Sequence, residues 1–429
     1  MPSSHGVSCG KRRVRPGHES PLPLNLQHRD PGSPPAPKAH WLNRERFVAY
    51  PRIVLALFVI IGGAWVALSK DLVDPVGKPL GYDFIAYWAA SHLALAGQPQ
   101  DAYNLQVLLE AERAAVPANT TIFPWYYPPT FYLVVLPLAL LPYLAAYFTF
   151  VLTTFAAYFA TFRRVVTGRE ATVCLIAFPG LWINFAHGQN GFLTAALAAA
   201  ALLCLQSRPY WSGVLIGLLA IKPHLAILFP IALIACGAWR TFAVAGLVAT
   251  LFLAVGTFVF GQATLTAFFG SLWMPRAIVE TLGSHLWLKM PTPIAMAQML
   301  GMPPLPARLL HAAVACGAIW AVWRVWRGCH TASLRSAALM VATFLVTPYA
   351  FDYDLAWLAF PIAWMALAGL RNGWLPGERE VLVAAWLLPL VMAPIGKLVP
   401  VQVAPAILAM FLWAIARRAR HGPSREPHR

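Results

Sequence analysis

Long apolar segments separated by short polar connections make up most of the chain. A helix needs about 20 apolar residues to cross a bilayer, and several of these segments have only about 13–16. Segments of that length are typical of broken or tilted helices buried among neighbours. The pattern predicts an all-α integral membrane protein, a polytopic helical bundle with about 12 crossings. The predicted segments are 51–69, 129–162, 171–186, 191–206, 209–221, 225–238, 241–260, 306–326, 335–350, 355–370, 381–396 and 401–416.

The segment 129–162 is longer than one straight crossing and contains Pro137 and Pro142. Because proline kinks or ends a helix, this segment is either one kinked crossing or a hairpin with unequal arms. Arg163 and Arg164 follow it, which favours one net crossing toward the cytoplasm.

Composition and charge agree with a membrane protein. The 429 residues are 59% hydrophobic and 11% charged, whereas soluble domains carry roughly 25% charged residues. The net charge is +16, but the basic residues follow apolar segments and do not alternate with aromatic residues. This arrangement indicates cytoplasmic loops and excludes nucleic acid as a partner.

Placing the basic connections inside gives the domain organisation. Residues 1–46, rich in proline and basic residues, are expected to form a disordered cytoplasmic tail. A transmembrane domain follows at 47–417, and a short basic cytoplasmic tail at 418–429. Two larger loops, 70–128 and 261–304, then lie on the outer face.

Asp83 lies in the first outer loop, within the stretch Gly81-Tyr82-Asp83-Phe84. Ionisable residues near a membrane interior are costly, and one that faces a cavity is a functional candidate. A carboxylate can take a proton from an attacking hydroxyl. An inverting glycosyl transfer needs one such base on the acceptor side, and it needs no second acid if a phosphate leaves. Asp83 is therefore a candidate general base.

Asp83 also precedes an apolar run from Phe84 to Ala96, so it can instead cap a helix. The two roles are compatible only if one carboxylate oxygen stays free. The run is expected to lie along the membrane surface, with Tyr87 and Trp88 as interfacial anchors.

Other polar residues fall on the same predicted outer face, each with a structural alternative. Lys222 would point outward to a phosphate, or snorkel at a helix end. The cluster His187-Gly188-Gln189-Asn190 could bind sugar hydroxyls or form a tight turn. Asp352 and Asp354 form a D-x-D pair that could hold a metal, contact a sugar or cation, or be structural. The candidate substrate-contacting residues are Tyr82, Tyr127, His187, Gln189, Asn190, Lys222, His224, His285, Lys289, Asp352 and Asp354.

Five stretches in this order resemble glycosyltransferase family 87, an integral membrane family with the C-type glycosyltransferase fold. They are Gly81-Tyr82-Asp83-Phe84-Ile85-Ala86-Tyr87, Tyr127-Pro128-Pro129, Gly188-Gln189-Asn190-Gly191, Ile221-Lys222-Pro223-His224 and Thr347-Pro348-Tyr349-Ala350-Phe351-Asp352-Tyr353-Asp354. The resemblance implies a polyprenyl-phosphate sugar donor, typically of mannose, used on the outer face. It also implies that Asp83 matches the family's catalytic aspartate.

The sequence thus predicts a hexosyltransferase, with mannose the leading sugar, in a bacterial inner membrane and with both termini cytoplasmic. Its expected partners are the polyprenyl-phosphate sugar, a lipid or glycan acceptor and membrane lipids. No cofactor or metal is expected. The alternative is a transporter or flippase of a lipid-linked glycan, which would need its site near the bilayer midplane.

Overall fold

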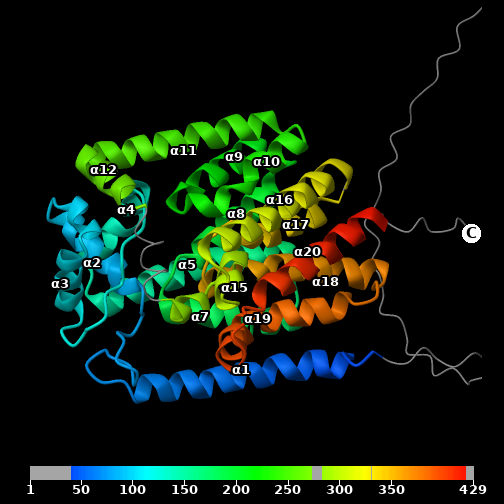
Figure 1. Cartoon of the computed structure of the whole chain (residues 1–429), viewed down its shortest axis with the longest axis horizontal. Coiled ribbons are helices and arrows are strands. Elements are labelled where there is room, and N and C mark those ends of the chain that lie inside the picture. Colours follow the sequence, from blue (N-terminus) through cyan, green and yellow to red (C-terminus); the bar gives the residue numbers. More distant parts are fainter. Residues whose placement is uncertain (1–39, 273–282, 330, 422–429) are drawn as a thin grey trace, which may run out of the picture. The chain divides into compact units, whose positions relative to one another are not determined.

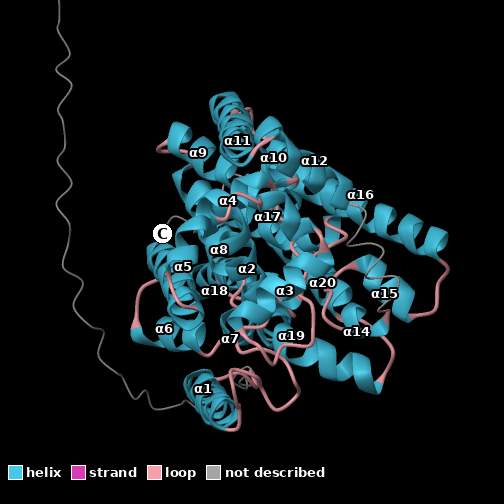
Figure 2. Ribbon diagram, turned by 90° about the vertical axis from the view of Figure 1, so that its left-hand side faces the viewer, coloured by secondary structure: helices cyan, strands magenta, loops and turns pink. Residues whose placement is uncertain are grey.

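The computed structural model describes residues 40–272, 283–329 and 331–421. From Arg44 onward these residues belong to one compact unit. It is helical, and its described part contains no β-strand (Figures 1 and 2). The α-helices are α1 Arg44–Ala67, α2 Phe84–Leu95, α3 Leu105–Ala115, α4 Pro129–Val135, α5 Tyr143–Val165, α6 Arg169–Ile176, α7 Pro179–His187, α8 Gly191–Cys204, α9 Pro209–Leu218, α10 Leu228–Ala235, α11 Trp239–Phe260, α12 Gln262–Ser271, α14 Ser284–Trp287, α15 Pro293–Met299, α16 Pro304–Gly328, α17 Ala332–Val346, α18 Ala359–Asn372, α19 Glu378–Leu398 and α20 Ala404–His421. The 3-10 helices are η1 Pro99–Tyr103, η2 Leu136–Leu140, η3 Leu219–Ile221, η4 Pro223–Ala226 and η5 Asp352–Leu358.

Six helical stretches in the described part are long and apolar enough to cross a membrane. Four of them are α1, α5, α11 and α16; the other two are Asp352–Asn372 and α19. Between them lie shorter apolar helices such as α8 and α17. The prediction of a polytopic, all-α membrane protein is confirmed, while the count of about 12 crossings stays a prediction.

The short helices form the interior of the bundle. In α17 every residue from Ser336 to Val346 is buried, and α8 buries an alanine-rich face. By contrast only 6% of the apolar window of α1 and 11% of that of α11 is buried. Small residues let helices approach closely in lipid: a Cβ on Gly217 of α9 would lie 2.6 Å from the Val248 side chain of α11. The prediction that short segments are buried among neighbours therefore holds for α8 and α17.

The segment 129–162 is broken and not a continuous kinked helix. Helix α4 passes into η2, and the chain leaves helical geometry at Leu141 before α5 begins at Tyr143. Pro137 lies in the first turn of η2, and Pro142 is the residue before α5. Each proline therefore starts an element, where its missing N–H costs nothing. Only α5 is a candidate span.

Helix α2 corrects the prediction of a surface helix. Its residues from Phe84 to Ser91 are all buried within the protein. Tyr87 is 1% exposed, and the Trp88 indole donates to the carbonyl of Leu141. These two side chains are therefore core residues and not interfacial anchors.

Both predicted tails overlap with helices of the folded unit. Helix α1 begins at Arg44, inside the predicted N-terminal tail, of which 1–39 lie outside the described residues. Helix α20 continues to His421, and Arg418 forms a buried ion pair with Glu378. Arg418 therefore belongs to the folded domain and not to a tail.

The two predicted outer loops meet in space. The Tyr103 ring of η1 lies 6.4 Å from the Phe268 ring of α12. In Figure 1, α2, α3 and α12 lie at one end of the unit, whereas the start of α1 and the end of α20 lie at the other. Helix α2, which follows Asp83, belongs to this end.

Candidate active site

A tight turn between α7 and α8 brings residues 187–191 against the start of α2. Gly188 ends α7 in the left-handed region, with φ 59°, and a Cβ there would lie 2.5 Å from Phe84 Cβ. A Cβ on Gly191 would lie 2.4 Å from Asn184 Oδ1, which accepts the Gly191 N–H at 2.9 Å. Glycine at these two positions permits the close approach.

Asp83 sits at the first position before α2, but its side chain does not cap the helix. Its Oδ2 instead accepts a hydrogen bond from Gln189 Nε2 at 2.9 Å. Within the described residues Oδ1 has no hydrogen-bond partner, and the residue is partly exposed. One carboxylate oxygen is therefore held and the other is free, as a general base requires.

The preceding residue fixes where Asp83 lies. Tyr82 has a positive φ of 41°, which is strained for a bulky side chain. Its hydroxyl donates to Asp74 Oδ2 at 2.5 Å, and its ring stacks on His187 with 5.1 Å between centroids. Burial and the bond to Asp74 raise the pKa of the Tyr82 hydroxyl above its usual range. Tyr82 is therefore anchored at both its backbone and its hydroxyl.

The Gln189 side chain faces the protein interior on its other side. Its Oε1 accepts from the Tyr87 hydroxyl at 2.5 Å and from the Tyr127 hydroxyl at 2.9 Å. The two hydroxyls are 2.6 Å apart. Gln189 and Tyr127 were both expected to contact substrate. Gln189 Oε1 and the Tyr127 hydroxyl instead form hydrogen bonds within the protein.

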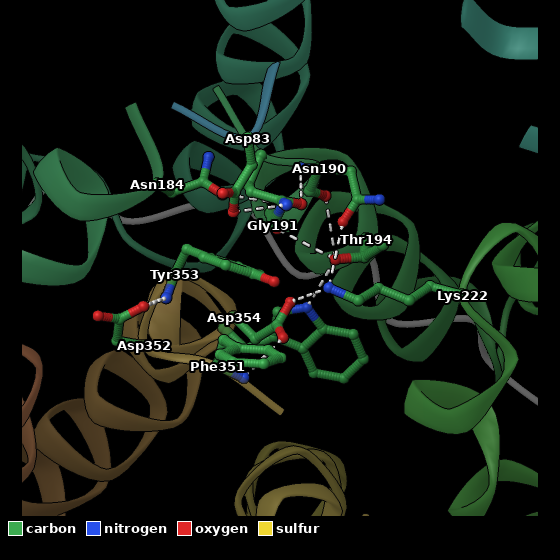
Figure 3. A network of polar contacts seen from close by, with 12 residues as sticks. Asp83, Asn184, Asn190, Gly191, Thr194, Lys222, Phe351, Asp352, Tyr353 and Asp354 are labelled. Carbon is green, nitrogen blue, oxygen red and sulfur yellow. Dashed lines mark hydrogen bonds and ion pairs between the residues drawn. The ribbon is translucent and has the colours of Figure 1, made fainter. Parts of the chain in front are cut away.

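Lys222 corrects the prediction of an outward-pointing cation. Its side chain is buried, and Nζ lies 2.6 Å from Asp354 Oδ1 and 3.4 Å from Asn190 Oδ1 (Figure 3). It also lies 4.9 Å from the centre of the Tyr353 ring. The lysine and the aspartate lie on connections far apart in sequence. Both side chains are buried, so neither is accessible to solvent.

The D-x-D pair is divided between two environments. Asp354 Oδ2 accepts from the Phe351 N–H at 3.1 Å, while Oδ1 holds Lys222. Asp352 points away from that pair (Figure 3), and its Oδ1 accepts from the Tyr353 N–H at 3.0 Å. The described residues contain no group of three or more His, Cys, Asp or Glu side chains placed to hold a metal ion.

Two lysines and a histidine lie around the ring of Tyr82, the residue before Asp83. Lys289 Nζ lies 3.3 Å from His187 Nε2, and His187 Nδ1 lies 2.9 Å from the Ile183 carbonyl. Because a carbonyl only accepts, Nδ1 must donate and Nε2 must accept from the ammonium group. Across the Tyr82 ring, Lys78 Nζ lies 5.8 Å from its centre. Desolvation and the charge of Lys289 lower the pKa of Lys78. The cation cluster is therefore the pair Lys78 and Lys289, with the neutral His187 ring bonded to Lys289.

The remaining predicted residues lie at the edge of the site or away from it. His285 is exposed on α14. His224, in η4, is half-buried, and its Nε2 has no hydrogen-bond partner among the described residues. Asn190 is fully buried, so for this residue the geometry supports the tight-turn alternative.

Comparison with protein families adds an independent observation. Residues 125–348, just over half of the chain, match the profile of glycosyltransferase family 87. The chain belongs to glycosyltransferase family 87. No curated protein and no solved structure matches the chain.

Family 87 membership makes the chain a membrane glycosyltransferase and decides against the transporter alternative. The matched range includes His187, Gln189, Lys222 and Lys289 but ends before the D-x-D pair and begins after Asp83. The role of Asp83 in this family 87 chain therefore rests on its geometry and on its resemblance to the family's catalytic aspartate.

Sequence reasoning missed several partners of the residues in the candidate site. Tyr87, Asp74 and Lys78 each contact a candidate residue directly, yet none was expected to do so. Lys78 could have been identified from the sequence as a site residue, since it is a cation only five residues from Asp83 in the predicted outer loop. Tyr87 carried none, because an aromatic residue in an apolar helix is equally compatible with the core.

A buried acid supports the loop that leads to Tyr127. Glu112 of α3 is fully buried, and it accepts from the Phe123 N–H at 3.1 Å and from Asn119 Nδ2 at 3.2 Å. Burial raises its pKa from 4.5 to about 8, against the opposing effect of the two hydrogen bonds. Between these two pH values the unfolded chain has lost the proton and the folded chain keeps it.

We therefore expect the folded state to become less stable as pH rises from about 5 to about 8, since the unfolded state binds fewer protons there. In thermal unfolding of the purified protein, the midpoint should fall by several degrees over this range. Glu112→Gln should flatten the pH dependence, whereas Glu110→Gln, on the exposed face of the same helix, should keep it. Equal slopes for wild type and Glu112→Gln would contradict the assignment.

Proposed function

We propose that this family 87 glycosyltransferase moves a hexose, mannose in the first instance, from a polyprenyl phosphate to a hydroxyl of a lipid or glycan acceptor. The observation that carries the proposal is the free Oδ1 of Asp83 beside the cation cluster. A carboxylate can accept a proton, and ammonium groups can receive an anionic leaving group. A phosphate-linked donor needs both.

The proposed reaction is a single displacement. Asp83 Oδ1 takes the proton of the acceptor hydroxyl as its oxygen bonds to the anomeric carbon. The bond from that carbon to the phosphate oxygen breaks, and the polyprenyl phosphate leaves with the electron pair. One carboxylate suffices because the leaving group is a stable anion, and attack from the opposite face inverts the anomeric centre.

Lys289 and Lys78 are the proposed phosphate-binding cations. Both are half-buried, and the described residues place no carboxylate oxygen within 4.0 Å of either ammonium group. Lys222 is less suited, since Asp354 already neutralises it. We propose that the buried Lys222–Asp354 pair instead fixes η5 against the turn after α7.

The orientation is part of the same proposal. The start of α1 and the basic last turn of α20 lie opposite the end that carries α2, α3 and α12 (Figure 1). The positive-inside rule supports placing the basic end in the cytoplasm. Asp83 then faces the outer side of a bacterial inner membrane, where a polyprenyl-phosphate sugar would enter sideways from the bilayer.

The donor is tested with purified wild-type protein, a lipid-extract acceptor and a panel of sugar donors. We expect transfer from polyprenyl-phosphate mannose and none from the nucleotide sugar. Lys289→Gln should raise the KM for the lipid donor by at least about ten-fold, the order expected for a hydrogen bond to a charged group. The matched control is Lys70→Gln, an exposed lysine in the loop that contains Lys78. Transfer from the nucleotide sugar alone would reject the proposed donor, and an unchanged KM in Lys289→Gln would reject the proposed phosphate contact.

A further inference from the structure

Gln189 joins the candidate base to two buried tyrosines. We infer that Gln189 is a positioning residue for Asp83, and that Tyr87 and Tyr127 act through it by fixing the direction of its amide. The inference rests on the proposed function in one respect only, which is that Asp83 is the base. It replaces the expectation that Gln189 and Tyr127 contact the substrate.

The amide direction follows from the donors around it. A glutamine side chain can place its oxygen at either end of the amide, and the hydrogen-bond network decides which. Tyr87 and Tyr127 bring hydroxyl donors to one end, so the oxygen must lie there. The NH2 group then faces Asp83 Oδ2. The reversed amide would set its oxygen against the carboxylate.

The number of protons makes the tyrosine pair redundant. The Tyr87 hydroxyl, the Tyr127 hydroxyl and Gln189 Oε1 lie within 2.5–2.9 Å of one another. These three contacts share only two hydroxyl protons, so in one hydrogen-bonded arrangement one tyrosine donates to the other. A single donor is enough to hold Oε1. Removing either hydroxyl therefore leaves the amide fixed. Removing both leaves Oε1 with only the long hydrogen bond from the Asn190 N–H, 3.4 Å, among the described residues.

Burial separates the positioning group from the substrate. Gln189 is 5% exposed, Tyr87 1% and Tyr127 8%, while Asp83 is partly exposed. The acceptor can thus approach Asp83 Oδ1 without meeting the three side chains behind it. With Oδ2 held by Gln189, the carboxylate cannot rotate its free oxygen away from that approach.

Kinetics of variants test the inference. Gln189→Leu should lower kcat by about 10–100-fold with the donor KM almost unchanged, since small misplacement of a reacting group costs about this much. Tyr87→Phe and Tyr127→Phe should each lower kcat by about three-fold. The double variant should approach the loss of Gln189→Leu and exceed the product of the two single losses. The control is Tyr132→Phe, a buried tyrosine whose hydroxyl donates to the Pro99 carbonyl, and it should keep kcat.

A substrate-free measurement separates this inference from the proposed function. A carbodiimide reacts with protonated carboxyl groups, and mass spectrometry of the purified protein follows its reaction at Asp83. Because Gln189 Nε2 occupies Asp83 Oδ2, Gln189→Leu and the double variant should free that oxygen, and Asp83 should be modified several-fold faster at pH 6. The single Phe variants should resemble wild type.

Each outcome bears on one of the two claims. If polyprenyl-phosphate mannose supports no transfer, the proposed donor is rejected, while the carbodiimide series still decides the role of Gln189. Unchanged Asp83 modification in Gln189→Leu overturns the positioning role. So does a rise in donor KM at unchanged kcat, which would make Gln189 a substrate contact. If the double variant does not fold, Gln189→Leu alone decides.

Discussion

Asp83→Asn is expected to lower turnover by about 10²–10⁴-fold while the protein inserts and folds normally. The substitution removes the proton acceptor and keeps an oxygen that can accept from Gln189 Nε2. The Asp83 side chain makes no capping hydrogen bond, so loss of a helix cap does not complicate the result. The measurement is transfer by purified wild type and variant at equal amounts of folded protein.

The matched control is Asp71→Asn, an exposed acid earlier in the same loop. Asp71 has a positive φ of 52°, a conformation that asparagine also tolerates. It should therefore retain turnover and folding. Near wild-type transfer by a well-folded Asp83→Asn protein would remove Asp83 as the base and direct attention to Asp352, whose Oδ1 accepts from the Tyr353 N–H and which forms no ion pair with a described residue.

Lys222→Ala is expected to destabilise the fold strongly, by about 3–5 kcal/mol, since it leaves the buried Asp354 carboxylate without its partner. Asp354 is fully buried, so water cannot replace the ammonium group. The measurement is the midpoint of thermal unfolding of the purified protein in detergent. A loss of donor affinity with an unchanged midpoint would restore the phosphate-binding role that the sequence suggested.

Two controls isolate the effect of the buried charge. Lys222→Ala combined with Asp354→Ala removes both charges and should recover part of the lost stability. Arg52→Ala breaks a bidentate but half-exposed ion pair with Glu170 on α6, and it should change the midpoint little because water solvates both groups. If the double variant is as unstable as Lys222→Ala, the charge explanation fails and lost packing takes its place.

Local pattern was sufficient for most of the fold. The apolar segment 241–260 became α11, and 306–326 became α16, because a long uninterrupted apolar run has few alternatives to a spanning helix. The break in 129–162 fell near Pro142, where the backbone N–H is missing. Helix α2 was placed wrongly because an apolar helix with Tyr and Trp has the same pattern on a membrane surface and in a core.

The sequence predicted which residues belong to the candidate site but not which of them contact one another. Asp83, Gln189, Lys222 and Asp354 were all named from the sequence, and the structure brings them close together. Their pairing was not predictable, since Gln189 and Asp83 are separated by 106 positions and Lys222 and Asp354 by 132. No local periodicity encodes contacts of that range. Lys222 was taken for a free cation because its partner lies on a connection whose direction only packing determines.

The distance in sequence between Lys222 and Asp354 also bears on how the protein is made. Lys222 separates two apolar helical stretches, Pro209–Ile221 and Pro223–Ala235, and so reaches the membrane with them. Its carboxylate partner is synthesised 132 residues later, a delay on the order of ten seconds at ribosomal speed. An ionisable residue near a membrane interior is costly while it has no partner. Of the two groups that hydrogen-bond Lys222 Nζ among the described residues, Asn190 precedes it and Asp354 follows it, so we expect this hairpin to reach its final place only after η5 has been made.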